Sequence, residues 1–350
     1  MAETLKNSIS ETFKTHNHSN LIFLDFNSIS QLPESHAWTP ESDSADPFLD
    51  DSVPVIDPFD PNALSHIRHA CENWGVFQVT NHGIQSQLLS EVEHQSRRLF
   101  SLPADQKLRA ARSLDAGIKG YGMSTLSPHF EKQMWSESFS IIGSPEEHAA
   151  KLWPDDHAKF CNVMEEYQRE MDGLSQKLMN LILGSLGLTL KDMEWAGSNT
   201  YKPLLQLNSY PVCPDPDRAM GLGPHTDSSF ITLLYQSKNT NGLEVYKEGI
   251  GWVKVHPIAN ALVVIVADMT HILTNGRVKS VLHRATVNKT RHRISAAYVH
   301  GPPENMKISP LMKLVDHDHS PLYPPMTWSE FLSVKKAHYN NHFEFIKIDI

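Results

Sequence analysis

The stretch that follows Tyr201 constrains the fold of this chain more than any other part of the sequence. It breaks into short runs rich in β-branched and aromatic residues, separated by Gly, Pro, Asn and Asp, which favour turns. The runs are residues 204–210, 230–235, 243–246, 252–255, 262–266, 280–287 and 293–299. Short, closely spaced strands of this kind are typical of sandwiches and barrels, and a jelly roll is the simplest closed arrangement.

The chain before Tyr201 mixes strands with helices. Residues 53–57 and 75–80 are short β-type runs that predict strands, with a helix over 62–74 between them and a turn at 81–83. The clearest helix is predicted over residues 157–186, where apolar residues recur every three or four positions and Gly187 provides a C-terminal stop. We interpret it as a scaffold against the core. The predicted class is therefore α+β, mainly β.

These patterns divide the chain into successive segments. Residues 1–50 lack sustained periodicity and predict a loosely ordered lead-in with one short helix. An N-terminal region over 51–155, the scaffold-helix region over 156–200, the jelly-roll core over 201–301 and a C-terminal extension over 302–350 follow. No internal repeat of fixed period is visible in the sequence, which disfavours solenoids and propellers.

Composition narrows the classes of function. The formal net charge is −9 at pH 7 and no basic patch is evident, so nucleic acid and membrane surfaces are not expected partners. The longest apolar run, residues 261–267, is far shorter than the roughly 20 residues of a membrane helix. The N-terminus shows no leader pattern, and the 3 cysteines include no C-x-x-C pair. We therefore expect a cytoplasmic protein, with a monomer as the default.

With 20 histidines in the chain, a metal site has to be argued from pattern. His225-Thr-Asp227 lies at the start of a strand-like run, and residues two apart on an extended backbone point to the same side. Because H-x-D often arises by chance as a surface pair, a third ligand is needed, and His283 supplies it from a later strand. Two imidazoles and one carboxylate form the facial triad that suits iron(II) and leaves positions open. A structural zinc site would instead be closed, usually with cysteine.

An open iron site that activates O2 needs an electron-donating co-substrate. 2-Oxoglutarate chelates iron at one end, and the carboxylate at its other end needs a cationic anchor. Arg293 and Ser295 offer a guanidinium and a hydroxyl on one face of a predicted strand, and a guanidinium meets a carboxylate with two hydrogen bonds. Asn208 and Tyr210 add an amide and a phenol. R-x-S alone predicts only a surface arginine, but N-x-Y, H-x-D, a distal His and R-x-S in this order are far more specific.

The sequence resembles the plant 2-oxoglutarate- and iron(II)-dependent dioxygenases over about residues 53–340. The motifs that carry this resemblance are Trp74-Gly-Val-Phe-Gln-Val-Thr-Asn-His-Gly83, Leu207-Asn-Ser-Tyr-Pro-Val-Cys-Pro214, His225-Thr-Asp-Ser228, Ser280-Val-Leu-His-Arg284 and Arg293-Ile-Ser295. Within that family the sequence is most similar to gibberellin 3-oxidases, in Ser35-His-Ala-Trp-Thr-Pro40, Met134-Trp-Ser-Glu137, His271-Ile-Leu-Thr-Asn-Gly276, Ile308-Ser-Pro310 and Lys313-Leu-Val315.

The resemblance implies a double-stranded β-helix flanked by helices, and an enzyme that hydroxylates a gibberellin at C3 in the biosynthesis of this plant hormone. Succinate and CO2 would be co-products, O2 the second co-substrate, and ascorbate an assay component. The resemblance assigns iron(II) to the H-x-D pair and the distal histidine, and 2-oxoglutarate to Arg293 and Ser295 with help from Asn208 and Tyr210. The candidate substrate contacts are Tyr121, Met123, Trp135 and Phe139.

The chain departs from the family pattern in two places. Ala267-Asp268 replaces Gly-Asp, a one-methyl change that should spare the metal. Ser138-Phe-Ser140 replaces Gly-Phe-Thr in a region expected to face the substrate, which leaves regioselectivity open. The alternatives within the enzyme class are a gibberellin 2-oxidase, a bifunctional 2,3-oxidase and a hydroxylase of flavonoids or other specialised metabolites. Outside it, the alternatives are a non-catalytic small-molecule binder and a metal-assisted hydrolase.

Overall fold

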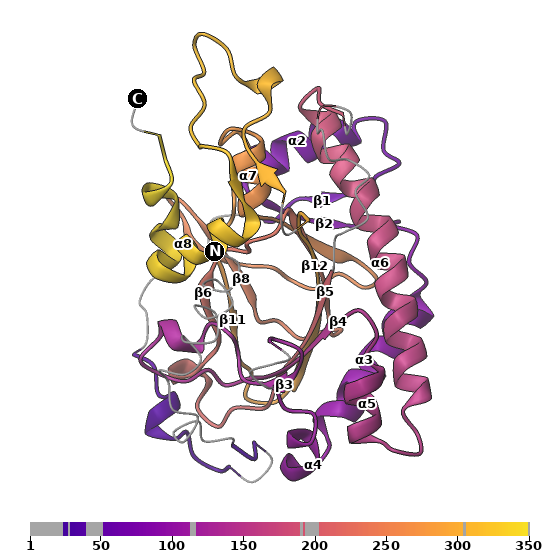
Figure 1. Ribbon diagram of the computed structural model, residues 1–350. Coiled ribbons are helices and arrows are strands. Elements are labelled where there is room, and N and C mark those ends of the chain that lie inside the picture. The colour runs from indigo at the N-terminus through magenta and orange to yellow at the C-terminus, as the bar shows by residue number, and fades with distance from the viewer. Residues whose placement is uncertain are drawn as a thin grey trace.

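The computed structural model describes residues 24–26, 29–39, 52–112, 117–189, 192, 203–303 and 306–348. Two β-sheets form its centre, and helices pack outside the larger sheet (Figure 1). This is the predicted α+β, mainly β architecture of a double-stranded β-helix with flanking helices. The boundaries proposed between the segments of the chain stay a prediction.

The larger sheet has 8 strands, and strands far apart in the sequence are neighbours in it. In spatial order they are β1 (Val55–Ile56), β2 (Val76–Val79), β10 (Leu262–Val266), β7 (Ile231–Gln236), β12 (Arg293–His300), β5 (Leu204–Tyr210), β4 (Glu137–Ile142) and β3 (Gly120–Gly122). β12 lies near the middle, antiparallel to both β5 and β7. Its first four residues, 293–296, are buried on both faces of the sheet.

The smaller sheet has 4 strands, in the order β6 (Met220–His225), β11 (His283–Thr286), β8 (Leu243–Lys247) and β9 (Gly251–Lys254). A separate strand pair, β13 (Lys307–Ile308) and β14 (Met326–Thr327), leads into the C-terminal helix α8 (Trp328–His338). α8 begins with a capping box, in which Thr327 and Glu330 bond to each other's backbone N–H groups. Such reciprocal bonds fix where the helix starts.

The helices form a layer on one side of the larger sheet. They are α2 (Ala63–Asn73), α3 (Ser86–Phe100), α4 (Ala104–Leu108), α5 (Glu146–Leu152) and α6 (Ala158–Ser185), with α7 (Asp268–Leu273) following β10. α6 runs along the outside of the barrel (Figure 1) and buries its apolar stripe there, as predicted for a scaffold helix. Gly187 adopts φ +75°, the left-handed conformation that ends the helix.

Side-chain alternation on β12 and β4 identifies the two faces of the larger sheet. The hydroxyl of Tyr298 donates to Asp172 of α6 over 3.1 Å, so this side of β12 faces the helices. On β4, Phe139 packs edge-to-face against Phe160 of α6, with ring centroids 6.1 Å apart. Since successive strand residues point to opposite faces, Arg293 and Ser295, of opposite parity to Tyr298, face the barrel interior.

Every strand predicted after Tyr201 is present, but the sequence pattern missed others. β6 and β4 were not predicted, and neither were the short β3, β13 and β14. Most of the predicted lead-in, residues 1–50, lies outside the described residues; within the described part, a single 3₁₀ turn spans Glu34–His36. Within the described residues, no helix combines the length and the apolar character that crossing a bilayer requires.

Candidate active site

The smaller sheet assembles the candidate metal ligands. β6 ends at His225, β11 begins at His283, and the two are direct cross-strand partners with ring centroids 4.2 Å apart. Oδ1 of Asp227 lies 3.7 Å from Nε2 of His225 and 3.8 Å from Nε2 of His283. The expectation that H-x-D begins a strand was wrong, because the chain leaves β6 after His225 and bends before β7 starts at Ile231.

Backbone hydrogen bonds orient both imidazoles. Nδ1 of His225 lies 2.8 Å from the carbonyl oxygen of Gly223, and Nδ1 of His283 lies 3.1 Å from that of Val281. Because a carbonyl only accepts, each Nδ1 carries the proton and each Nε2 presents its lone pair towards Asp227. The rings are therefore held in the tautomer that binds metal through Nε2.

Burial sets the charge of this cluster. Burial and the neighbouring His283 lower the pKa of His225 to about 3, so its imidazole is neutral at pH 7. For Asp227, burial acts to raise the pKa, but the interactions with His283 and His225 outweigh it and leave the pKa below its usual value. The neutral imidazole of His225 and the ionised carboxylate of Asp227 are in the forms that bind a cation.

The donor set fits a divalent iron ion. One ligand atom from each of His225, Asp227 and His283 lies within 4.8 Å of the others. The separations to Asp227 are below the roughly 4.2 Å that two metal–ligand bonds of about 2.1 Å can span. Two imidazoles and one carboxylate leave further coordination positions open, as iron(II) oxygenases require.

A side chain of the C-terminal helix α8 supports the loop that carries Asp227. Lys335 donates to the carbonyl oxygen of Thr226 over 2.7 Å and to its hydroxyl over 2.9 Å, and it forms an ion pair with Asp268. Asp268 is fully buried; its N–H donates to the carbonyl oxygen of Asp227 over 2.9 Å, and its carboxylate accepts from Ser280 over 2.6 Å. This network connects both metal-bearing segments to the C-terminal helix.

Sequence reasoning missed Lys335, because it follows its partner Asp268 by 67 positions and no local pattern links the two. It did identify Ala267 as an extra methyl group beside Asp268. Ala267 is fully buried in an extended conformation with φ −118°, which requires no glycine. The methyl group is accommodated without strain, so the departure leaves the metal ligands in place.

The candidate 2-oxoglutarate anchor lies on the interior face of the larger sheet. Arg293 pairs across the strands with Tyr210, and Ser295 pairs with Asn208, whose amide donates to the Ser295 hydroxyl over 3.5 Å. The guanidinium of Arg293 lies 4.9 Å from the Tyr210 ring centroid. The structure thus brings together all of the residues that the sequence proposed for this role.

Arg293 lacks enough partners for its buried charge. The side chain is 1% exposed, and Nη2 donates to Oε1 of Gln236 over 2.8 Å, but Nε and Nη1 bond to none of the described residues. Burial lowers the pKa of this guanidinium, yet an arginine stays charged at neutral pH. A buried cation with unused donors fits the distal carboxylate of 2-oxoglutarate.

Two glycines allow Tyr210 and Arg293 to pack closely against the backbone, and sequence reasoning did not single them out. A Cβ added to Gly221 would lie 2.7 Å from the Tyr210 ring, and one added to Gly242 would lie 2.8 Å from Cδ of Arg293. Gln236, which the sequence analysis also missed, is the last residue of β7. Its register opposite Ser295 becomes visible only once the sheet is known.

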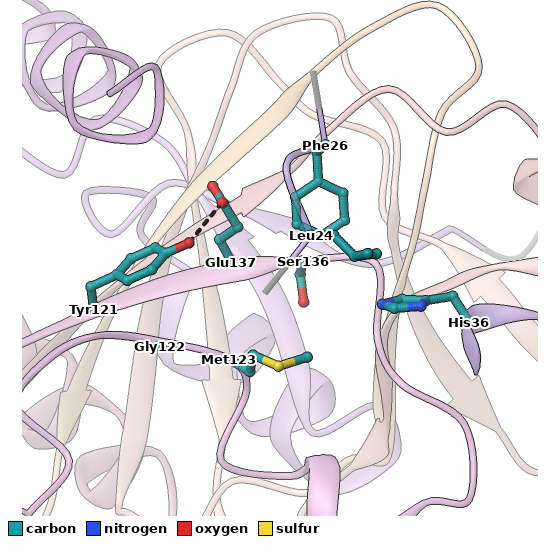
Figure 2. A pocket seen from close by; sticks show the side chains of 8 residues that line it. All are labelled: Leu24, Phe26, His36, Tyr121, Gly122, Met123, Ser136 and Glu137. Atoms are coloured by element: carbon teal, nitrogen blue, oxygen red, sulfur yellow. Dashed lines mark hydrogen bonds between the residues drawn. The ribbon is translucent and has the colours of Figure 1, made fainter. Parts of the chain in front are cut away.

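The candidate substrate contacts fall into different environments. Tyr121 and Met123 line a small pocket between the N-terminal segment and β3–β4 (Figure 2). The other lining residues are Leu24, Phe26, His36, Gly122, Ser136 and Glu137. The Tyr121 hydroxyl donates to Glu137 over 2.8 Å, an interaction visible in Figure 2. Glu137 is also paired with buried Lys107 at 2.5 Å, so this phenol is engaged within the protein.

Trp135 and Phe139 do not line this pocket. Trp135 is fully buried, packs edge-to-face on Phe26 with centroids 4.9 Å apart, and donates from Nε1 to the carbonyl oxygen of Pro211 over 3.2 Å. Phe139 points to the helices, because its parity on β4 is that of the outer face. The structure therefore gives both residues packing contacts, and their proposed contact with substrate gains no support.

Comparison with known proteins agrees with this geometry. Residues 201–302 match the family model described as 2OG-Fe(II) oxygenase superfamily, and residues 49–156 match the non-haem dioxygenase in morphine synthesis N-terminal model. The chain is 48% identical to gibberellin 3-beta-dioxygenase 3 of Arabidopsis thaliana, covering 95% of this chain and 97% of the relative. It is 47% identical to gibberellin 3-beta-dioxygenase 1 of Pisum sativum, covering 97% and 94%.

Among solved structures, the crystal structure of JOX2 in complex with 2OG, Fe and JA superposes with a TM-score of 0.80 and 30% identity. The match covers 92% of this chain and 95% of that one. The fold, the metal triad and the sequence similarity over nearly the full chain all indicate the same family. The chain belongs to the 2-oxoglutarate- and iron(II)-dependent dioxygenase family.

Proposed function

We propose that this protein hydroxylates a gibberellin at C3, with 2-oxoglutarate and O2 as co-substrates and succinate and CO2 as co-products. The observation that carries the proposal is the similarity to gibberellin 3-beta-dioxygenases over nearly the whole chain, in a barrel that has both the triad and the buried anchor. A gibberellin is a rigid, mostly apolar ring system that bears a carboxylate. Its recognition therefore needs apolar surface and one or more cationic or hydrogen-bonding contacts.

In this proposal, separate groups of residues bind the metal and the co-substrate. His225, Asp227 and His283 would hold iron(II) from one side, with Nδ1 of each imidazole bonded to the backbone. Arg293 would pair with the distal carboxylate of 2-oxoglutarate, supported by the ring of Tyr210. The bound iron, 2-oxoglutarate and O2 supply the oxidation of an unactivated C–H bond. The protein positions the substrate relative to the metal, and this position determines which carbon reacts.

The test is to incubate the purified protein with iron(II), ascorbate, 2-oxoglutarate and a gibberellin that lacks the C3 hydroxyl. Mass spectrometry against standards should show the 3-hydroxylated product. A 2-hydroxylated product would make the protein a 2-oxidase, and both products together a bifunctional enzyme. The absence of any gibberellin product would overturn the substrate assignment.

The metal assignment has its own control. His225→Ala should abolish succinate formation, whereas substitution of the exposed His256 by alanine should leave it unchanged. An anaerobic reaction should also yield no succinate, because O2 is a co-substrate. Succinate formation by the His225→Ala variant at the rate of the unaltered protein would show that the metal lies elsewhere.

The expected setting, a monomer in the cytoplasm, is part of this proposal. It is supported by the net charge of −9, which does not favour an anionic membrane surface. Light scattering coupled to size-exclusion chromatography should give the mass of one chain. A mass of two chains or more would overturn the monomer.

A further inference from the structure

A half-buried arginine, Arg112, also reaches the interior of the barrel. The backbone N–H of Arg112 donates to the carbonyl oxygen of Tyr121 over 2.9 Å, which ties this segment to β3. Its Nη1 donates to the carbonyl oxygen of Met123 over 2.6 Å. Its Nη2 donates to the hydroxyls of Ser138 over 2.9 Å and Ser140 over 2.8 Å. These serines are the ones that depart from the family pattern.

The two serines lie on the interior face of β4, the face opposite to Phe139. Strand register extends this row across the sheet, because Ser138 pairs with Asn208 and Asn208 pairs with Ser295. Ser295 is therefore two strands away from Ser138, or about 10 Å at the usual spacing between strands. Arg112 and the 2-oxoglutarate anchor thus face the same interior from separate places on one wall.

The charge of Arg112 is not balanced by a carboxylate. Its hydrogen-bond partners are two hydroxyls and a carbonyl, Nε has no partner, and no ion pair of Arg112 is found within the described residues. Burial lowers the pKa of its guanidinium to about 10, which still leaves it charged at neutral pH. The buried Lys107 and Arg284 are paired with Glu137 and Glu244, whereas Arg293, like Arg112, forms no ion pair with a described residue. Arg112 is half-buried with Nε fully enclosed, so its uncompensated charge favours a ligand that supplies a counter-charge.

We propose that Arg112 binds the carboxylate of the substrate, with Ser138 and Ser140 holding the guanidinium in place. This inference rests on the proposed function and extends it to the orientation of the substrate. 2-Oxoglutarate would pair with Arg293, which leaves Arg112 as the interior cation available for a second acid. A carboxylate fixed on β4 would determine which ring carbon is presented to the metal on the opposite sheet.

The test compares a gibberellin acid with its methyl ester, which has the same ring system without the charge. Binding is measured anaerobically by calorimetry on the full chain loaded with iron(II) and 2-oxoglutarate. The unaltered protein should bind the acid more tightly than the ester. Arg112→Gln should weaken binding of the acid by at least about tenfold and leave the ester unchanged, as expected when a buried charge pair loses one partner.

Two further variants separate recognition from folding. Arg112→Lys keeps the charge without the planar fork and should retain part of the preference for the acid. Arg98→Gln removes an arginine of α3 that is paired with Asp156 outside the barrel, and should leave the preference unchanged. The KM for 2-oxoglutarate should be the same in Arg112→Gln as in the unaltered protein, which distinguishes Arg112 from Arg293.

Equal weakening of acid and ester in Arg112→Gln would show that Arg112 only holds β3 and β4 together, and would overturn the inference. An unaltered protein that binds acid and ester equally would also overturn it. Failure of the proposed function is seen separately, as an unaltered protein that prefers the acid but forms no hydroxylated product. A protein that binds neither compound would overturn both.

Discussion

Lys335 donates a hydrogen bond to the backbone carbonyl oxygen of Thr226 over 2.7 Å, and Thr226 is the residue between the metal ligands His225 and Asp227. The same ammonium group pairs with Asp268, which bonds to the backbone of Asp227. One side chain of the C-terminal helix therefore supports both the charge balance and the backbone of the metal loop. Contacts of this kind position a metal ligand without touching the metal.

Lys335→Met should reduce both stability and iron affinity. It leaves Asp268 buried without its cation, which costs about 3 to 5 kcal/mol of unfolding free energy. The Kd for iron(II) should rise about 10- to 100-fold, as when supporting groups of a metal site are lost. Denaturant unfolding and iron titration measure the two effects. Lys336→Met, at the exposed neighbouring position, is the matched control and should change stability by less than about 0.5 kcal/mol.

Arg293→Lys should weaken 2-oxoglutarate selectively. A lysine keeps the charge but cannot form the two parallel hydrogen bonds of a guanidinium, so the KM for 2-oxoglutarate should rise at least about tenfold. Succinate formation at varied 2-oxoglutarate measures this change. The exposed Arg291, substituted in the same way, should show the normal KM. An unchanged KM in Arg293→Lys would place the distal carboxylate elsewhere.

β6 shows why the sequence pattern failed to predict some of the strands. Met220-Gly-Leu-Gly-Pro-His225 contains two glycines and a proline, which disfavour a strand when read locally. The structure shows why glycine is needed, because Tyr210 packs directly on Gly221 and Phe130 on Gly223. The requirement comes from partners elsewhere in the chain. By contrast, β12 and α6 were predictable, because burial imposes a regular apolar pattern on them.

The same distinction applies to the candidate site. The triad and Arg293 were found because each belongs to a short motif with a known chemical use. Gln236, Lys335 and Arg112 were not found, since their partners are 57, 109 and 26 residues away in the chain. Phe139 was offered as a substrate contact because only the register of β4 reveals which side it faces.

Gly221→Ala should destabilise the protein, whereas Gly173→Ala should stabilise it. The new methyl group at Gly221 would meet the Tyr210 ring at 2.7 Å and the Ala285 carbonyl oxygen at 3.0 Å, an overpacking that costs about 1 to 3 kcal/mol. At Gly173, inside α6, an added Cβ would meet nothing within 4 Å beyond the neighbouring backbone of its own helix, and alanine should add about 0.5 to 1 kcal/mol through helix propensity. Thermal and urea unfolding compare the two. Equal changes in unfolding free energy for the two variants would contradict the proposed close packing at Gly221.

Stability should fall when the pH is lowered from about 7 to about 4. Burial lowers the pKa values of His36, His292 and His300 to about 4, from an ordinary value of 6.5. Between these values the unfolded chain binds more protons, so each histidine contributes a loss of at most about 1.4 kcal/mol per pH unit. Urea unfolding at pH 7, 6 and 5 measures the slope. His300→Gln should flatten it, and an unchanged slope would exclude His300 as a contributor.

The bond between Lys335 and Thr226 also has a consequence for how the enzyme matures. These residues are separated by 109 positions, so the metal loop is synthesised long before its support. A nascent chain on the ribosome would expose the H-x-D segment without the lysine that steadies it. The iron affinity of the loop should therefore reach its full value only after α8 has emerged and docked.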